Sequence, residues 1–174
     1  AKGHNFPNLT LVGVVDADLG LKGGDLRAGE RTFQLISQVS GRAGRADRPG
    51  RALIQTYDPE NEIMQALARQ DRDGFLDAEA RARQDMGMPP FGRLGALLVA
   101  APGDAEANAA ANALGAAALA ADGVDVWGPA PAPLSVIRGM HRRRFLVRAD
   151  RGVDLSAYVA AWTGRVPLST PAPR

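Results

Sequence analysis

Apolar residues with two different spacings mark the first sixty positions of the chain. Residues 9–15 form a continuous run rich in β-branched side chains, which predicts a buried strand of a parallel sheet. Residues 51–57 predict a second strand. Between them, apolar positions recur at helical spacing and predict a stripe formed by Phe33, Ile36, Val39 and Ala43. The order strand, helix, strand predicts one α/β unit, in which ligands bind at the carboxyl ends of the strands.

The rest of the chain changes period several times. We expect helices over residues 62–69 and 73–86, a strand over 92–101, a helix over 104–121, a short extended segment over 125–127, a stiff irregular connection over 128–133, a hairpin of 134–138 and 142–149, and a helix over 154–163. From residue 92 onward the order β-α-β-β-α predicts a split βαβ, ferredoxin-like module with a weak or missing last strand. The domain boundary is expected near Pro89-Pro90, where the second helix ends.

Composition narrows the possible functions. The chain lacks cysteine, which excludes disulfides and thiolate metal sites and fits a reducing, cytoplasmic compartment. No apolar run approaches the length of a membrane span, so we expect no membrane association. The net charge is only +2, but arginines cluster in residues 42–51 and 138–151. Local basic surfaces, rather than the whole molecule, are therefore the candidates for binding a polyanion.

One motif, Q-x-x-G-R-x-G-R at residues 38–45, carries the first candidate chemistry. On a helix, Gln38, Arg42 and Arg45 would share one face. Gly41 and Gly44 lie among them, and each costs a helix about 1 kcal/mol relative to alanine, so a close approach of a backbone or ligand is expected there. Arginine makes bidentate contacts to phosphate oxygens. The alternative is a solvated basic turn that ends the helix.

The sequence around this motif resembles a known family. Residues 2–7 (K-G-H-N-F-P), the apolar run, Asp16-Ala17-Asp18, residues 27–31 and the motif occur in the order and spacing of motifs V and VI of superfamily 2 helicases. The resemblance is strongest to the PriA family of bacterial replication-restart helicases. It is strong over the first third of the chain and looser onward through residues 88–91 and 127–131. A start inside a motif and without Met indicates a C-terminal fragment of a longer protein.

The resemblance implies a fold and an activity. The fold class would be α/β. Residues 1–57 would be the end of a RecA-like helicase lobe 2 with a parallel sheet, 58–90 a helical connection, and 91–174 a small α+β split-βαβ domain that binds DNA or a partner. The whole protein would be an ATP-dependent DNA helicase that restarts stalled forks and initiates primosome assembly.

The resemblance also implies cofactors and partners. ATP and Mg²⁺ would be bound mainly by an upstream lobe, and zinc by an upstream cysteine region. This chain has no Walker A loop and no D-E-x-H pair, so we do not expect it to hydrolyse ATP alone. The expected partners are forked DNA, single-strand-binding protein and other primosome proteins, in the cytoplasm at the nucleoid.

Catalytic roles implied by the resemblance fall on the motif. Arg45 would stabilise the γ-phosphate in the transition state, with Arg42 as its partner, as an arginine finger does. Gln38 would bridge to the nucleotide or to the coupling network. The structural alternative is a salt-bridged pair at a helix end.

Further contacts are implied for the start of the chain. Gly3 and Asn5 would contact the nucleotide, and Lys2 the DNA strand. Related helicases often carry Asp where Asn5 stands, and Asn keeps an acceptor but loses the charge. His4 would either take part or simply pack.

Asp16 and Asp18 follow the first strand and form a pair of carboxylates. Such a pair suits Mg²⁺, but the family binds its Mg²⁺ in the other lobe. The preferred interpretation is that these acids hold the motif arginines in place, and no metal site is predicted.

A basic hairpin is the second candidate site. Its members are Arg138, His141, Arg142, Arg143, Arg144 and Arg148. Strand alternation places Arg142 and Arg144 on one face and Arg143 on the other. We expect Arg138, Arg142 and Arg144 to contact the DNA backbone; a solvated, protective edge strand is the alternative. Trp127 and Phe145 would either stack on bases or belong to the core.

Two other functions remain open at this stage. The parent protein could be another superfamily 2 translocase, such as a branch-migration enzyme of the RecG type. The chain could also be a stand-alone module that binds nucleic acid or protein and retains helicase remnants.

Overall fold

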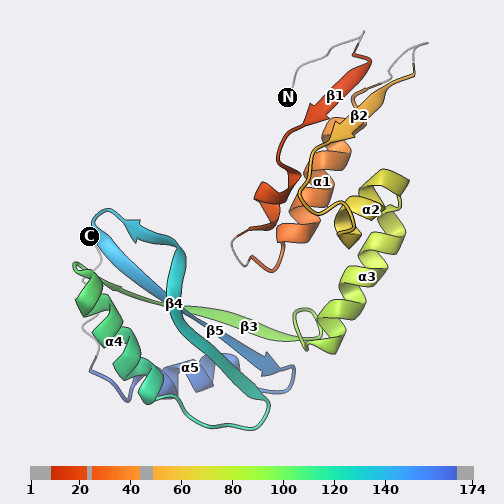
Figure 1. Ribbon diagram of the computed structural model, residues 1–174. Helices are drawn as coiled ribbons and strands as arrows, with labels where there is room; N and C mark the ends of the chain where they lie inside the picture. Colours follow the sequence, from red (N-terminus) through yellow and green to blue (C-terminus); the bar gives the residue numbers. More distant parts are fainter. Residues whose placement is uncertain (1–8, 23–24, 44–48, 168–174) are drawn as a thin grey trace. The chain divides into compact units, whose positions relative to one another are not determined.

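The computed structural model describes residues 9–22, 25–43 and 49–167 of the chain (Figure 1). The chain divides into two compact units, Ala1–Glu79 and Ala80–Arg174. The division falls inside helix α3 (Arg72–Asp85), between the boundaries predicted at residues 57 and 90. Those finer domain assignments stay predictions.

Unit 1 is built on two short parallel strands. Strands β1 (Leu11–Val14) and β2 (Arg51–Ile54) pair in register from Leu11 with Arg51 to Val14 with Ile54. A 3-10 helix, η1 (Ala17–Leu21), and helix α1 (Ala28–Ser40) connect them. The predicted strand–helix–strand order and the parallel pairing are therefore confirmed.

The core of unit 1 lies on one side of these strands. Phe33 and Ile36 of α1 are buried, as the predicted stripe requires, against Met64 and Leu67 of helix α2 (Glu62–Arg69). The ring of Phe33 stacks on that of Phe75, with the centroids 4.4 Å apart.

The prediction of a fully buried first strand is wrong for the structure described. Leu11 of β1 is 54% exposed and Leu53 of β2 is 62% exposed, whereas Val14 and Ile54 pack against the core. The reason is that the core covers a single face of this two-stranded sheet, so alternate side chains point to the other face.

Unit 2 is an antiparallel sheet with two helices. Its elements are β3 (Gly92–Ala101), α4 (Asp104–Ala116), β4 (Val124–Ile137), β5 (Met140–Asp150) and α5 (Leu155–Thr163). The strands lie in the order β3-β5-β4, and β5 pairs antiparallel with both neighbours. The predicted order β-α-β-β-α is confirmed. The alternative of β5 as an edge strand is wrong, because both of its edges are paired.

Two local predictions for unit 2 fail for tertiary reasons. The proline-rich stretch 128–133 lies inside the continuous strand β4, which accommodates it with two irregularities in its register with β5. At Gly128 φ is 125°, and a Cβ there would lie 2.7 Å from the carbonyl oxygen of Arg144. The helix expected to reach residue 121 ends at Ala116. The hydroxyl of Tyr158 donates to the Leu119 carbonyl at 2.7 Å, a contact that helix propensity does not reveal.

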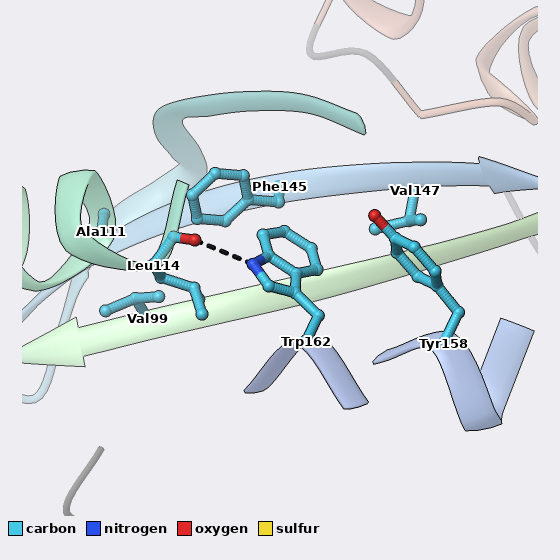
Figure 2. Packing of buried hydrophobic residues seen from close by; sticks show 7 residues of the cluster. All are labelled: Val99, Ala111, Leu114, Phe145, Val147, Tyr158 and Trp162. Carbon is cyan, nitrogen blue, oxygen red and sulfur yellow. Dashed lines mark hydrogen bonds between the residues drawn. The ribbon is translucent and has the colours of Figure 1, made fainter. Parts of the chain in front are cut away.

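Aromatic side chains fill the core of unit 2 (Figure 2). Trp162 is fully buried, and its Nε1 donates to the carbonyl oxygen of Leu114 at 2.8 Å. The Phe145 ring meets it edge to face, with the centroids 5.3 Å apart. Val147 and Val99 pack in the same cluster. Phe145 is therefore a core residue and is not available to stack on a base.

The two faces of this sheet differ. Helices α4 and α5 pack on the face that carries Val99, Phe145 and Val147 (Figure 1). Neither helix covers the other face, which we call the open sheet face. Strand alternation and the pairing register assign to it Leu94, Ala96, Leu98 and Ala100 of β3, Asp125, Trp127 and Ala130 of β4, and Arg142, Arg144, Leu146 and Arg148 of β5.

Candidate nucleic-acid interface

The Q-x-x-G-R-x-G-R motif coincides with the end of α1. The helix ends at Ser40, and Gly41 caps it, its N–H pointing to the carbonyls of Ser37 and Val39. Arg42 lies in the turn that follows the helix. The prediction that Gln38 and Arg42 share one helical face is therefore wrong for Arg42. Gln38 is exposed and Arg42 half-buried. Arg45 lies outside the described residues, as do Lys2, Gly3, His4 and Asn5.

A cavity of about 530 Å³ opens beside this helix end. The last turn of α1, strand β2 and the end of α2 line it, with Gly41 and Ile54 among the lining residues. The Ser40 hydroxyl oxygen is buried and has no hydrogen-bond partner in the described part of the chain. The cavity lies where the glycine spacing predicts a close approach, and the identity of its occupant stays a prediction.

The Asp18 carboxylate is hydrogen-bonded to the residues that follow β2. Its carboxylate accepts hydrogen bonds from the Thr56 hydroxyl at 2.8 Å and the Tyr57 N–H at 3.0 Å. These bonds, first that from the Tyr57 N–H and then that from the Thr56 hydroxyl, lower the pKa of Asp18. Asp16 precedes η1 with φ of 53°. Within residues 9–22, 25–43 and 49–167, no three His, Asp or Glu side chains are grouped to hold a metal.

The basic hairpin turns tightly at Arg138 and Gly139. Ile137 pairs with Met140, and the two residues between them have φ of 51° and 76°. Positive φ at both positions is the type I′ geometry that suits the twist of a hairpin. The hairpin is confirmed, with its turn one residue earlier than residues 139–141. Arg138 is exposed at the tip.

Arg143 has a structural role within unit 2. It is buried on the helix-covered face, where its guanidinium donates to Asp104 at 2.7 Å and to Asn108 at 2.6 Å. Asp104 opens α4, where the helix dipole favours a negative charge. The hydrogen bond from Arg143 is the largest cause of a lowered pKa at Asp104, and His141 Nδ1 lies 3.3 Å from the same carboxylate.

Arg148 is also engaged, although it lies on the open sheet face. Its guanidinium pairs with Asp125 at 3.0 Å and with Asp150 at 2.7 Å. Two carboxylates therefore surround this cation, and it adds no free positive charge to the face.

Arg142 and Arg144 remain as the cations of the open sheet face. Both are half-buried, and no acidic partner is recorded for either within the described residues. Arg142 makes one long hydrogen bond, 3.4 Å, to the Leu134 carbonyl. The predicted alternation is confirmed, because Arg142 and Arg144 face away from Arg143.

Trp127 lies on the same face, opposite Leu146 in the register, and is 44% exposed. From the sequence, the core was the favoured place for Trp127, and only the strand pairing shows that it lies on the open sheet face. The partner of Arg143, Asp104, stands 39 positions away and was not predicted either. A lone acid at a helix start carries no signal for such a contact.

No helix among the described residues has both the length and the apolar character needed to cross a membrane.

One family model matches a segment that begins close to the start of unit 2. Residues 84–170 match the sequence model described as "Primosomal protein N C-terminal domain". The chain is 40% identical to a Replication restart protein PriA of Rickettsia felis over 167 residues, which is 96% of this chain and 26% of that protein. It is 37% identical to the PriA of Bacillus subtilis over 159 residues, 90% of this chain and 20% of that protein.

A third relative shows a similar degree of identity. The PriA of Treponema pallidum is 39% identical over 151 residues, covering 86% of this chain and 23% of that protein. The chain thus spans about a quarter of the length of these curated relatives. The model of the family's C-terminal domain matches half of this chain's residues, and similarity to the first relative extends over nearly all of the chain. The chain therefore belongs to the PriA family of primosomal proteins and contains that family's C-terminal domain.

Proposed function

We propose that this chain acts in replication restart as part of an ATP-dependent DNA helicase, and that unit 2 is a module of that helicase which grips DNA. Similarity to proteins named for replication restart supports the first part. The second part rests on one observation: among the arginines of strand β5, only Arg142 and Arg144 lie on the open sheet face without an acidic partner in the described part of the chain.

The chemistry of these two side chains suits a phosphate backbone. Guanidinium groups make strong, charge-assisted bonds to phosphate oxygens, and contacts of this kind do not depend on base sequence. Arg138, exposed at the tip of the hairpin, extends the basic track. The proposed ligand is forked DNA, with single-strand-binding protein and other primosome proteins as further partners.

Unit 1 would serve ATP hydrolysis in the full-length protein. Arg45 would stabilise the γ-phosphate in the transition state, with Arg42 and Gln38 beside it. Gly3 and Asn5 would contact the nucleotide and Lys2 the DNA. The cavity beside Gly41 supports this assignment because it leaves room next to the motif. ATP with Mg²⁺ would be held mainly by an upstream RecA-like lobe, and zinc by an upstream cysteine region.

A salt series with a labelled three-way fork tests the DNA grip. We expect the chain to bind the fork, and Arg142→Ala combined with Arg144→Ala to flatten the slope of log affinity against log salt by about 1.8, roughly 0.9 for each lost phosphate contact. The matched control is Arg151→Ala combined with Arg165→Ala, which removes two exposed charges outside the sheet. Equal effects of the two pairs, or no binding at low salt, would refute the proposal.

The catalytic assignment is tested in the full-length protein. Arg45→Ala is expected to lower ATP turnover by about 10³-fold or more, as loss of an arginine finger does, with fork affinity nearly unchanged. Normal turnover in this variant would overturn the assignment of Arg45.

A further inference from the structure

The open sheet face carries an aromatic side chain that the core does not use. Trp127 is 44% exposed, whereas Trp162, the other tryptophan of the chain, is fully buried and hydrogen-bonded. In the register, Trp127 stands opposite Leu146, which in turn stands opposite Ala96. The indole therefore lies on an apolar row that crosses the sheet and is flanked at its far end by a small side chain.

The neighbouring row carries positive charge. Arg144 stands between Ala130 of β4 and Leu98 of β3, which is 46% exposed. Leu146 and Arg144 are two residues apart on β5, so the aromatic and cationic rows are separated by roughly 7 Å. Arg142 continues the cationic side of the face in the same direction.

The charge balance of this face selects the ligand. Arg148 pairs with both Asp125 and Asp150, the residue at the end of β5, so these five described charges sum to +1, and the positive charge without an acidic partner lies on Arg142 and Arg144. A ligand that complements the face must offer a flat apolar surface next to a negative charge. An unpaired nucleotide has both, because each base has a π-face and each link to the next base is a phosphate.

We infer that the open sheet face binds a single-stranded stretch of nucleic acid, with a base stacked on Trp127 and the adjoining phosphates on Arg144 and Arg142. The inference rests on the proposed function and adds the class of ligand that the open sheet face binds, which is unpaired nucleic acid. Stacking requires a base that is out of a duplex, so Trp127 contributes to binding of unpaired DNA alone. The arginines contribute to binding of duplex and single strand alike.

Intrinsic fluorescence and labelled oligonucleotides test this inference on the chain. An oligothymidylate of about ten nucleotides is expected to quench the exposed tryptophan saturably, and a duplex of the same length is expected to leave it nearly unchanged. Trp127→Ala should weaken oligothymidylate binding by roughly 5- to 100-fold, with duplex affinity within about twofold of the wild type. Trp127→Phe should retain most of the affinity, measured by anisotropy of the labelled oligonucleotide, while the quenching disappears.

A matched control comes from the same strand. Val136 is 50% exposed and stands opposite His141, which places it on the helix-covered side of the sheet. Val136→Ala should therefore bind both DNA forms as the wild type does. If Trp127→Ala binds the oligothymidylate as well as Val136→Ala does, the stacking inference is overturned. Binding of the duplex would in that case still support the proposed contacts between the arginines and the phosphate backbone. If neither DNA form binds, the proposed function and the inference fall together.

Discussion

Replacing Trp162 by phenylalanine is the sharpest test of the core of unit 2. The substitution removes the hydrogen bond from Nε1 to the Leu114 carbonyl, which has a net value of about 1 kcal/mol. It also removes roughly 40 Å³ of side chain from a fully buried site, which at about 24 cal/mol per Å³ adds about 1 kcal/mol. The Leu114 carbonyl keeps the N–H of Ala117 at 3.1 Å, so it is not left unpaired.

The expected loss in the free energy of unfolding is therefore about 2 kcal/mol. Urea unfolding followed by tryptophan fluorescence measures this loss for unit 2, because both tryptophans of the chain lie in unit 2 and unit 1 contains none. With a slope of about 2 kcal/mol per molar urea, the midpoint should fall by about 1 M.

Trp127→Phe is the matched control for this test. The same chemical change at a side chain that is 44% exposed and outside the core should cost within about 0.5 kcal/mol. If both variants shift the midpoint equally, the packing described for Trp162 is incorrect.

Three further outcomes follow from single contacts. The hydrogen bond from Arg143 lowers the pKa of Asp104, so the stability that this carboxylate contributes is present above the usual aspartate range and is lost as the pH falls. On acidification, the urea midpoint should therefore drop less in Asp104→Asn than in the wild type. Asp18 has a lowered pKa for a similar reason, and Asp18→Asn should speed amide hydrogen exchange at the end of β2, an effect that acid should reproduce in the wild type. Gly139→Ala should destabilise the hairpin by about 1 kcal/mol in thermal unfolding, because φ is 76° there, whereas Gly152→Ala, which meets open space without a positive φ, should cost less.

Each of these outcomes has a clear contrary result. Identical acid sensitivity of the wild type and Asp104→Asn would mean that the ion pair with Arg143 adds nothing. Unchanged exchange in Asp18→Asn would remove the role given to its carboxylate. Equal costs at the two glycines would contradict the positive φ of the turn.

Local patterns were sufficient to predict most elements of both units. The strand over residues 92–101 and the helix over 62–69 have the bounds expected from hydrophobic spacing and from their flanking turns. The helix expected over residues 154–163 begins at Leu155, and Asp154 caps it because its carboxylate accepts the N–H groups of Ser156 and Ala157.

The parts that sequence did not predict depend on distant contacts. The proline-rich segment became strand because β5 lies along it, and the Ala-rich helix stopped early where its following residues joined the core. Alternation separated Arg143 from Arg142 and Arg144, but which side faces solvent follows from where the two helices pack. The same packing decides that Phe145 is internal and Trp127 external, although both were equivalent candidates.

The central place of β5 sets an order on the folding of unit 2. Strands β3 and β4 are made first, yet neither pairs with the other, and each depends on β5 for its sheet partner. The pairs between β3 and β5 run from Ala101 with His141 to Gly92 with Asp150, so every one of them closes a long loop. During synthesis the sheet cannot form until β5 has left the ribosome, and until then both earlier strands offer unpaired edges. A chain stopped before Met140 would therefore lack the whole sheet rather than one strand of it.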